Sequence, residues 1–348
     1  MTDLAPWIVV VHNENAIAEL SRLAGLATPM ALRVAVTLGL PERLAGDGDD
    51  PARLAPELDV SAVGLTLLLN HLTTLGVVER TATGYRTTAF GAHLRADAGN
   101  MLATLLHLDT AGGRGELALV ELAHSVTTGQ EAYSRRYGQD FWADLAEHPH
   151  LRASFDRQMT RRLRDEVPQI VAGFDWSRFG TLVDVGGGRG HLLAAILTAN
   201  PRLRGHLLDL APTAADARQT FADAGLGDRA EVTAGSFFDP LPAGADAYLM
   251  VDILHDWDDE HADRILSRCV EAATPASRVL VVEPVGGEHA STGIDLVMLT
   301  LYGGRERRAD EFRTLAAAHG LVLDTMTTVS GGRSLLEFRF DATVGTKG

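Results

Sequence analysis

The stretch "TLVDVGGGRGHLLAAILTANP", residues 181–201, joins a short β-rich run to a group of glycines and then to an apolar, helix-like segment. The run "GHLLDL", residues 205–210, follows with the pattern of a second strand. A strand, a turn, a helix and a second strand form a βαβ unit, whose two strands lie parallel. Further strand-like and helix-like runs alternate up to "SRVLVVEPV", which predicts an open, Rossmann-like α/β sheet.

The glycine-rich turn opens a helix, whose first N–H groups and positive dipole end attract a ligand. The dinucleotide pattern G-x-G-x-x-G fits in neither register, because Arg189 or His191 stands where a glycine is required. The pattern D-x-G-x-G-x-G does fit, through Asp184, Gly186, Gly188 and Gly190. A carboxylate at this turn is unfavourable beside a pyrophosphate and suits an ammonium group. The turn is therefore predicted to bind S-adenosyl-L-methionine (SAM) rather than NAD.

Two further positions fit the same ligand. Asp209 ends the second strand about 20 residues after the glycines, the usual offset for an acid that binds ribose hydroxyls. Ser236 and Phe237 follow the third strand, where a hydroxyl could bond the edge of an adenine and a ring could stack on its face. The alternative is that Asp209 caps a loop and that Phe237 belongs to the core.

A histidine follows the fourth strand in "MVDILHDWDDEHADRIL". His255 is placed at the cofactor crevice of an open sheet and has the chemistry of a general base. Methyl transfer requires a hydroxyl that is deprotonated and held in line with the methyl carbon. Glu283, which ends "VLVVE", and Glu306, in "GGRERRADEF", are acids that could orient the imidazole.

The same segment is rich enough in His and Asp to suggest a metal site. However, His255 and His261 stand six positions apart and do not share a helix face, and H-E-x-x-H does not occur. Residues 258–260, "DDE", fit an N-cap and first-turn acids of a helix. No metal is therefore predicted.

The N-terminal part has a different sequence pattern. Residues 16–45 show apolar positions at helical spacing, a helix is expected over about 61–75 with Asp59 or Ser61 as its cap, and Gly84 marks a β-hairpin. This is the winged-helix pattern, yet residues 61–78 contain no Lys or Arg, and residues 52–86 balance three cations against three anions. Nucleic acid is therefore not an expected partner, because phosphate contacts need cations. The apolar helices predict a homodimer through residues 1–100.

Residues 100–170 are predicted to be mainly helical, with helix breaks at a second "GGRG", residues 112–115, and at Gly129. The runs "LVLDTMTTVS" and "RSLLEFRF" flank Gly331–Gly332 and predict a terminal antiparallel hairpin. The predicted fold class is thus α/β, in four parts. These are a mostly helical winged-helix dimerisation domain (1–100), a helical connector contributing to the substrate pocket (101–165), a Rossmann-like SAM-binding domain (166–340) and a disordered tail (341–348).

Composition limits the function classes. The 348 residues have a formal net charge of −15, which disfavours nucleic acid and anionic membranes as partners. Cys269 is the single cysteine, so a disulfide within the chain and a thiolate metal cluster are both excluded. No apolar run reaches the length of a membrane span, and the first residues lack the basic start of a signal peptide. A cytoplasmic protein is expected.

In the order "LVDVGGGRG", "LLDL", "GSFFDPLP", "LHDWDDEHADRIL", "VEPV" and "GGRERRADEF", the chain resembles SAM-dependent O-methyltransferases. The resemblance is to the plant caffeate type and its bacterial relatives in aromatic polyketide pathways, and it covers almost the whole chain. The segments "LATPMALRVA", "ELAHSV", "RYGQDFW" and "ASFDRQM" are similar to naphthoic acid O-methyltransferases of enediyne antibiotic biosynthesis. Many relatives have Asp where Ser236 stands and Lys where Val251 stands.

The resemblance implies a role for each of several residues. His255 would be the base, with Glu283 and Glu306 as its flanking acids. The SAM site would consist of Asp184, Gly186, Gly188, Asp209, Leu210, Ser236, Phe237 and Trp257. The substrate pocket would contain Trp142, Phe155 and Met159. Spacing adds Asp295, Met298 and Tyr302, which share one helix face that either lines the pocket or belongs to the core.

The function predicted is methyl transfer from SAM to a phenolic hydroxyl of an aromatic metabolite of the naphthoic acid or polyketide kind, leaving S-adenosyl-L-homocysteine. Two alternatives stay open at this point. One is a SAM-binding relative with other chemistry, namely C-methylation, hydroxylation or decarboxylation. The other is a winged-helix regulator that senses a small molecule. Four cations could pair with a substrate carboxylate, and the sequence does not choose among Arg22, Arg33, Arg135 and Arg136.

Overall fold

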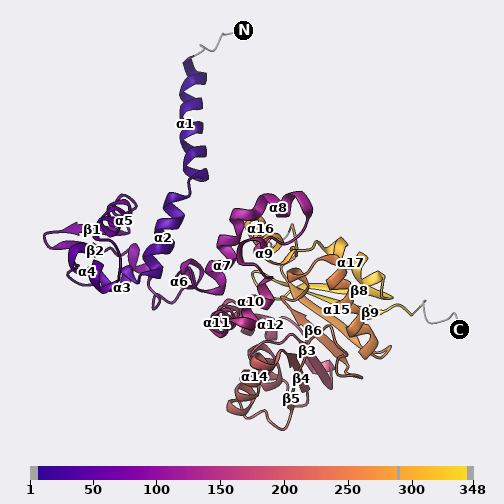
Figure 1. Cartoon of the computed structure of the whole chain (residues 1–348). Coiled ribbons are helices and arrows are strands. Elements are labelled where there is room, and N and C mark those ends of the chain that lie inside the picture. The colour runs from indigo at the N-terminus through magenta and orange to yellow at the C-terminus, as the bar shows by residue number, and fades with distance from the viewer. Residues whose placement is uncertain (1–6, 288–290, 343–348) are drawn as a thin grey trace. The chain divides into compact units, whose positions relative to one another are not determined.

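The computed structural model describes residues 7–287 and 291–342, so most of the predicted tail lies outside the described residues. The chain divides into two compact units, Met1–Gly113 and Arg114–Gly348, whose elements are labelled in Figure 1. The boundaries predicted at residues 100, 165 and 340 stay predictions. Within the described ranges, no helix is both long and apolar enough to cross a bilayer.

The first unit has the predicted helices and hairpin. Its elements are α1 (Trp7–Ala24), α2 (Ala27–Thr37), α3 (Leu40–Arg43), α4 (Pro51–Glu57), α5 (Ala62–Thr74), β1 (Val78–Thr81), β2 (Gly84–Thr87), η1 (Gly91–Leu94) and α6 (Leu102–Leu106). Ser61 caps α5, since its Oγ accepts the Gly64 N–H at 3.3 Å. Asp59 instead has a left-handed backbone, with φ of 54°. β1 and β2 pair antiparallel from Val78↔Thr87 to Thr81↔Gly84.

Leucines form the core of this unit, with Leu40, Leu44, Leu69 and Leu72 almost completely buried. Other apolar side chains of the unit are left exposed. These are Ile17, Leu20, Leu23, Leu26, Val63, Leu67, Phe90 and Leu102. Such an apolar surface is typical of a protein–protein interface.

The second unit opens with short helices and continues into an α/β sheet. Its first elements are α7 (Ala111–Ala118, which begins just before the unit boundary), η2 (Leu119–Glu121), α8 (Leu122–Thr128), α9 (Tyr133–Tyr137), α10 (Phe141–Glu147), α11 (Pro149–Arg164), α12 (Val167–Ala172) and η3 (Trp176–Arg178). Then follow β3 (Thr181–Val185), α13 (His191–Ala199), β4 (Arg204–Asp209), α14 (Ala211–Asp223), β5 (Ala230–Ala234), β6 (Ala247–Val251) and η4 (Leu254–Asp256). The last are α15 (Asp259–Ala272), β7 (Arg278–Glu283), α16 (Thr292–Tyr302), α17 (Ala309–Ala317), β8 (Leu321–Thr328) and β9 (Ser334–Phe340).

The predicted helix break at residues 112–115 was wrong. Helix α7 runs through these glycines. A Cβ on Gly113 would lie 1.9 Å from the carbonyl oxygen of His107, and one on Gly115 would lie 3.1 Å from Leu301. These two glycines therefore permit close packing. Gly129, by contrast, ends α8 in a left-handed conformation, with φ of 72°, as predicted.

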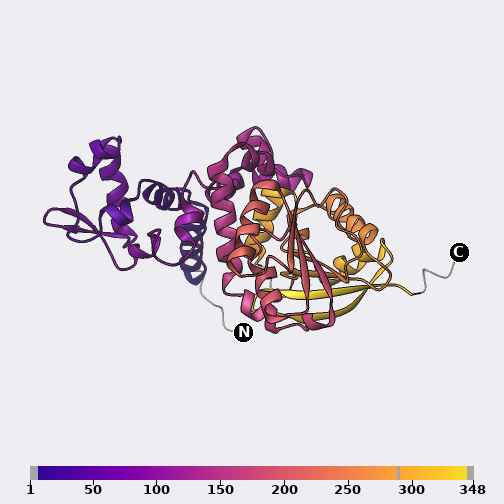
Figure 2. The ribbon, with the colours of Figure 1, turned by 90° about the horizontal axis from the view of Figure 1, so that it is seen from below.

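The sheet of the second unit has the order β5-β4-β3-β6-β7-β9-β8. Its first five strands are parallel, and β9 pairs antiparallel with both β7 and β8, which confirms the terminal hairpin. Helices lie on both faces of this sheet, as Figure 2 shows. Alternate residues of β3 and β6 enter different cores. Val183 and Met250 pack toward α15 and α17, whereas Leu182 and Leu249 pack toward α12 and α13.

Because neighbouring parallel strands run in one direction, their carboxyl ends meet at one edge of the sheet. The glycine turn follows β3, Asp209 ends β4, η4 with His255 follows β6, and Glu283 ends β7. The topology thus brings these four features of the sequence to the same edge.

Candidate active site

The glycine turn between β3 and α13 is packed against protein atoms on one side and has no protein neighbours on the other. A Cβ on Gly186 would lie 2.5 Å from Ile253 Cδ1, and one on Gly187 would lie 2.5 Å from Asp184 Oδ2. Gly188, with φ of 59°, has no neighbour within 4 Å of the position of a Cβ. The turn therefore excludes side chains on its inner side and leaves its backbone accessible to a ligand.

Two carboxylates lie against this turn. Asp184 is 2% exposed, and its burial and then the charge of Asp209 raise its pKa to about 7. Asp209 Oδ2 accepts the Gly188 N–H at 2.8 Å and its Oδ1 accepts the Leu210 N–H at 2.7 Å. Burial raises the pKa of Asp209 as well. Two carboxylates can accept hydrogen bonds from an ammonium group and from ribose hydroxyls. They would repel the negative charge of a pyrophosphate. The residues present therefore fit SAM.

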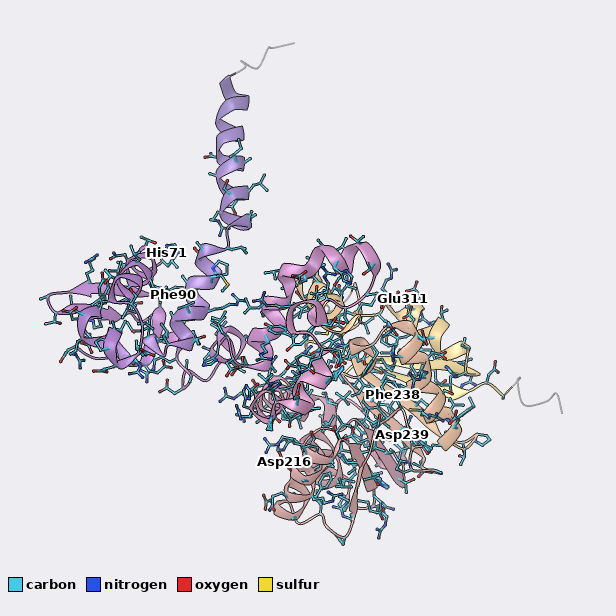
Figure 3. The ribbon with its side chains drawn as sticks, viewed as in Figure 1. His71, Phe90, Asp216, Phe238, Asp239 and Glu311 are labelled. Atoms are coloured by element: carbon cyan, nitrogen blue, oxygen red, sulfur yellow. The ribbon has the colours of Figure 1, made fainter. Side chains whose placement is uncertain are left out.

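The predicted adenine contacts lie beside the turn. The ring of Phe237 packs edge-on against Phe238 at 5.0 Å and against Trp257 at 5.9 Å between centroids. Ser236 Oγ accepts the Phe238 N–H at 3.2 Å. Leu210, the N-cap of α14, is 42% exposed at the mouth of the turn. Figure 3 locates Phe238 and the neighbouring Asp239.

An aromatic cluster continues from Trp257. The ring of Trp142 stacks on Trp257 at 5.9 Å and on Tyr302 at 5.4 Å, and it meets Phe155 edge-on at 5.5 Å. The structure thus brings together four predicted site residues, three from α10, α11 and α16 and one, Trp257, from the C-cap of η4. Met159 is half-buried on α11, and Met298 is buried on α16.

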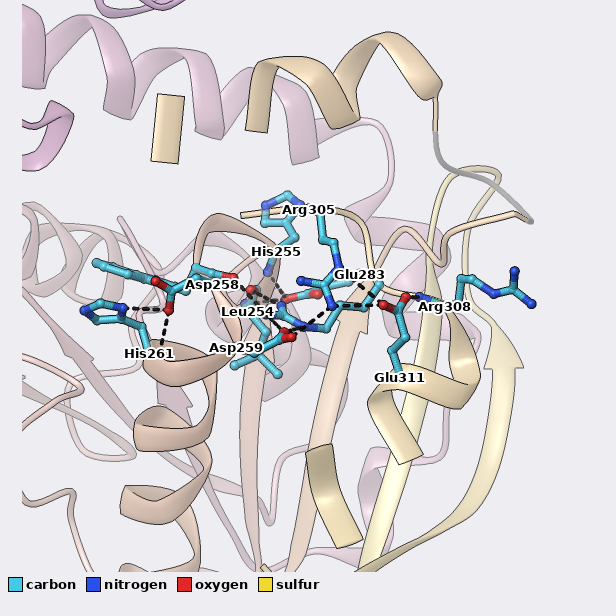
Figure 4. Close-up of polar contacts among 11 residues, drawn as sticks. Leu254, His255, Asp258, Asp259, His261, Glu283, Arg305, Arg308 and Glu311 are labelled. Carbon is cyan, nitrogen blue, oxygen red and sulfur yellow. Dashed lines mark hydrogen bonds and ion pairs between the residues drawn. The ribbon is translucent and has the colours of Figure 1, made fainter. Parts of the chain in front are cut away.

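His255, which Figure 4 labels near Glu283, is 2% exposed in η4, and two other acids lie on either side of its ring. Its Nδ1 lies 3.2 Å from Glu306 Oε1. Its Nε2 lies 3.4 Å from Asp256 Oδ1. The contact of the imidazole with Glu306 is the one expected from the sequence. Asp256 was not anticipated, because an acid next to a histidine in the chain usually points away from it.

Glu283 hydrogen-bonds the backbone of this turn, and it acts on the imidazole through its charge, which raises the pKa of His255. Its predicted role as an acid that orients the ring stays a prediction. Its Oε1 accepts the N–H groups of Ile253, Leu254 and His255 at 3.0, 2.6 and 3.3 Å. One buried carboxylate oxygen therefore fixes the turn that holds His255. Burial raises the pKa of Glu283 to about 7, although the charge of His255 opposes this.

The loop after α16 supports the same turn. A Cβ on Gly304 would lie 2.0 Å from the His255 carbonyl oxygen, so no side chain is possible there without a shift. The guanidinium of Arg307, which is fully buried, donates to the carbonyl oxygens of Leu254 and of Trp257, the latter at 2.8 Å. This role of Arg307 was not predicted, because an arginine in a segment of mixed charge usually lies at the surface.

The charges around His255 decide its protonation. Burial by itself would lower the pKa of His255, but the charge of Asp256 and the hydrogen bond to Glu306 outweigh it and raise that pKa to about 10. The charges of Asp252 and Glu283 act in the same direction. Without ligands, the imidazole therefore holds a proton at neutral pH.

A fourth acid, half-buried Asp252, anchors the start of this turn. Asp252 has a left-handed backbone, with φ of 53°, and its carboxylate binds Arg333 through bonds of 2.9 and 2.6 Å. Arg333, 2% exposed in the β8–β9 hairpin, also binds Glu166. Burial opposes ionisation, yet the charges of Arg162 and Arg333 lower the pKa of Asp252 to about 2. Backbone strain of this kind is not visible in a sequence.

Several predicted substrate contacts have other partners. Asp295 Oδ1 accepts the Glu306 N–H at 3.1 Å, so Asp295 supports an acid of the site. Arg135 and Arg136 are exposed and contact Glu121 and Tyr137. In the first unit, exposed Arg22 pairs with Glu19, and buried Arg33 donates to the Pro29 carbonyl oxygen.

The acidic residues after His255 lie at the N-terminus of the helix that follows. Asp258 caps α15, since its Oδ1 accepts the His261 N–H at 2.8 Å. Among the described residues there is no group of three or more His, Cys, Asp and Glu side chains arranged to hold a metal ion. Arg189 in the glycine turn lies 3.1 Å from Asp216 on α14, which Figure 3 labels.

The fold and this site define a class. Residues 119–322 match the O-methyltransferase domain family, and residues 20–97 match the O-methyltransferase dimerisation domain. The chain belongs to this family and is a SAM-dependent O-methyltransferase with a dimerisation domain.

Two relatives place it within the family. It is 48% identical over 313 residues to 2,7-dihydroxy-5-methyl-1-naphthoate 7-O-methyltransferase of Streptomyces carzinostaticus, covering 89% of this chain and 94% of the relative. It is 42% identical over 332 residues to aclacinomycin 10-hydroxylase RdmB of Streptomyces purpurascens, covering 92% and 88%.

A solved structure of an O-methyltransferase (NcsB1) from neocarzinostatin biosynthesis is also similar. It is in complex with SAM and 2-hydroxy-5-methyl naphthoic acid. The TM-score is 0.87 at 46% identity, over 92% of this chain and 98% of that chain. The similarity therefore extends over both units of the chain.

Proposed function

We propose that this enzyme methylates a phenolic hydroxyl of an aromatic acid of the naphthoic type, with His255 as the general base. The observation that supports the proposal best is a buried imidazole held by Glu306 beside an aromatic cluster that is large enough to pack against fused rings. The names of the relatives, which include a naphthoate 7-O-methyltransferase, favour the same class of acceptor.

SAM supplies the methyl group as a sulfonium when it is bound. Asp184 would bind its ammonium group and Asp209 its ribose hydroxyls, while Phe237, Ser236 and Leu210 would surround its adenine. A positive charge placed beside His255 lowers the pKa of the imidazole, so bound SAM would favour the neutral form that acts as a base. His255 Nε2 would then take the phenol proton, and Glu306 would stabilise the imidazolium through Nδ1.

The aromatic cluster would position the acceptor. Trp142 and Tyr302 stack on each other, and their faces and edges suit a flat ring next to them. Met159 and Met298 would fill the space around such a ring with polarizable side chains. The acceptor hydroxyl must then lie in line with the methyl carbon, which is the main source of rate acceleration in this reaction.

The test is incubation of the purified enzyme with SAM and 2,7-dihydroxy-5-methyl-1-naphthoic acid, followed by mass spectrometry. The expected product has gained one methyl group on oxygen, with stoichiometric S-adenosyl-L-homocysteine. A hydroxylated or decarboxylated product would overturn the proposal in favour of chemistry like that named for the 42% identical hydroxylase. A C-methylated product, recognised by NMR, would also overturn it.

We also propose that the chain works as a homodimer through its first unit. The exposed apolar residues of α1 and α5, together with the match to a dimerisation domain, support this assembly. A cytoplasmic location stays a prediction.

A further inference from the structure

One face of helix α11 is turned toward the aromatic cluster. Phe155, Gln158, Met159 and Arg162 follow one another at i, i+3, i+4 and i+7, so they share this face. The ring of Phe155 fixes its direction, because it packs against Phe141 and Trp142 at 5.5 Å each. Arg162, one helical turn beyond Met159, is half-buried on the same face.

The guanidinium of Arg162 has no partner of its own. Within the described residues, no hydrogen bond or ion pair is found for it, although the chain holds 46 Asp and Glu residues. Its charge nevertheless acts on the site, since it lowers the pKa of Asp252 and opposes the rise in the pKa of Asp256, two half-buried acids of the turn that holds His255. Because neither carboxylate bonds it directly, the N–H donors of the Arg162 guanidinium can still pair with an anionic ligand.

Two neutral polar atoms nearby are also unsatisfied. Trp142 Nε1 and Gln158 Oε1 are buried and have no hydrogen-bond partner in the described structure. Buried polar groups in native proteins are nearly always paired, so these two atoms indicate a polar ligand that completes the site. Arg162 and Trp142 are both donors, and an acidic ligand would satisfy both of them.

We propose that Arg162 selects the acceptor by binding its carboxylate, with Trp142 Nε1–H as a second donor. This inference rests on the proposed function, because it assumes an aromatic hydroxy acid whose ring lies against Trp142 and Tyr302. A planar guanidinium binds a carboxylate through two parallel hydrogen bonds, which fixes the orientation of the ring as well as its charge. The hydroxyl to be methylated is thereby directed toward His255.

The experiment compares Arg162→Gln with Arg161→Gln, an exposed arginine one position earlier on the same helix. The two acceptors are 2,7-dihydroxy-5-methyl-1-naphthoic acid and its carboxamide, which lacks the charge. For the wild type, we expect kcat/KM to favour the acid. For Arg162→Gln, we expect KM for the acid to rise about 10–100-fold, the usual range for hydrogen bonds to a charged group, and KM for the carboxamide to rise much less, so that the preference for the acid is lost. Arg161→Gln should behave as the wild type.

Binding is measured separately, by calorimetric titration of the acid into enzyme saturated with S-adenosyl-L-homocysteine. Arg162→Gln should weaken this binding by the same factor and leave S-adenosyl-L-homocysteine affinity unchanged. Equal losses for the acid and the carboxamide would assign Arg162 a structural role and overturn the inference. A wild type that methylates both acceptors equally would overturn it while the proposed function stands. If neither acceptor is methylated, the proposed function fails. The titration then shows by itself whether Arg162 binds the carboxylate of the acid.

Discussion

Nδ1 of His255 lies 3.2 Å from Oε1 of Glu306, although 51 positions separate these residues in the chain. The contact directs the other ring nitrogen, Nε2, away from Glu306. It depends on the loop that Gly304 and Arg307 hold against η4, and on Asp295, which accepts the backbone N–H of Glu306. The orientation of the proposed base therefore depends on contacts from several segments at the carboxyl edge of the sheet.

Replacing His255 by alanine removes the proposed base. We expect kcat to fall about 10²–10⁴-fold, the usual contribution of general base catalysis, with SAM affinity nearly unchanged. A phenol has a pKa of about 10, so the deficit should shrink as the pH rises toward that value. Steady-state kinetics from pH 6 to 10 and calorimetric titration with SAM measure the two effects. Full turnover of the variant near pH 7 would show that proximity alone drives the reaction.

Glu306→Gln should change the pH profile as well as the rate. The hydrogen bond to Glu306 raises the pKa of His255, so its loss lowers that pKa. A base must be neutral to act, and the acidic limb of kcat/KM should therefore move to lower pH, while kcat falls less than in His255→Ala. Glu311→Gln is the matched control, because Glu311 contacts Arg305 and Arg308 and not the imidazole. An unmoved limb in Glu306→Gln would contradict the assignment.

SAM affinity should depend on pH through Asp184. Burial and the charge of Asp209 raise the pKa of Asp184 to about 7, and only its ionised form attracts an ammonium group. Affinity is therefore complete above pH 7 and is lost as the pH falls, by up to about tenfold per unit. Calorimetry between pH 5.5 and 8 measures the slope. Asp184→Asn should bind SAM weakly and without this slope, whereas Asp216→Asn should retain it. Parallel curves for the Asp184 variant and the wild type would refute the role.

The parts of the site that the sequence predicts are those encoded locally. Apolar runs of five or six residues give the strands, and a glycine turn after such a run gives the ligand site, because neighbouring residues determine both. The position of His255 at the carboxyl edge of the sheet is predicted in the same way, because His255 comes shortly after β6 in the chain. The contact with Glu306 was expected only from family resemblance and not from spacing.

What could not be predicted depends on distant contacts. Glycine costs about 1 kcal/mol in a helix, so "GGRG" in α7 suggests a break, yet Gly113 and Gly115 lie where His107 and Leu301 leave no room for a side chain. The backbone hydrogen bonds of Glu283 were missed for a similar reason, because the geometry of η4 and not the chemistry of the carboxylate decides which N–H groups it meets. Arg162 was overlooked, since sequence alone does not show that a cation lacks a partner.

Leu20→Asp should separate the proposed dimer. Leu20 is 66% exposed in the first unit and lies on the apolar side of α1, with Leu23 nearby. Burial of a leucine contributes about 1.5–3 kcal/mol, so dimer dissociation should increase by at least about tenfold per subunit replaced. Light scattering across micromolar concentrations is the measurement, and Arg22→Asp, on the polar side of the helix, is the control. A monomeric wild type would refute the assembly, and a Leu20→Asp dimer of unchanged stability would exclude this surface.

Gly304→Ala tests the close approach that supports the base. The added Cβ would lie 2.0 Å from the His255 carbonyl oxygen, 2.6 Å from the Asp256 carbonyl carbon and 2.8 Å from the Trp257 nitrogen. These are backbone atoms, so the strain cannot be relieved by a side-chain rotation, and η4 must shift. We expect the free energy of unfolding to fall by about 1–3 kcal/mol, as for other overpacked sites, and kcat to fall up to about 10²-fold, because displacement of a catalytic group by about 1 Å has that cost.

Gly227→Ala is the matched control, since nothing lies within 4 Å of its Cβ position. Thermal unfolding and steady-state kinetics measured together distinguish the outcomes. If Gly304→Ala matches the control in both Tm and kcat, the loop does not hold His255 as described.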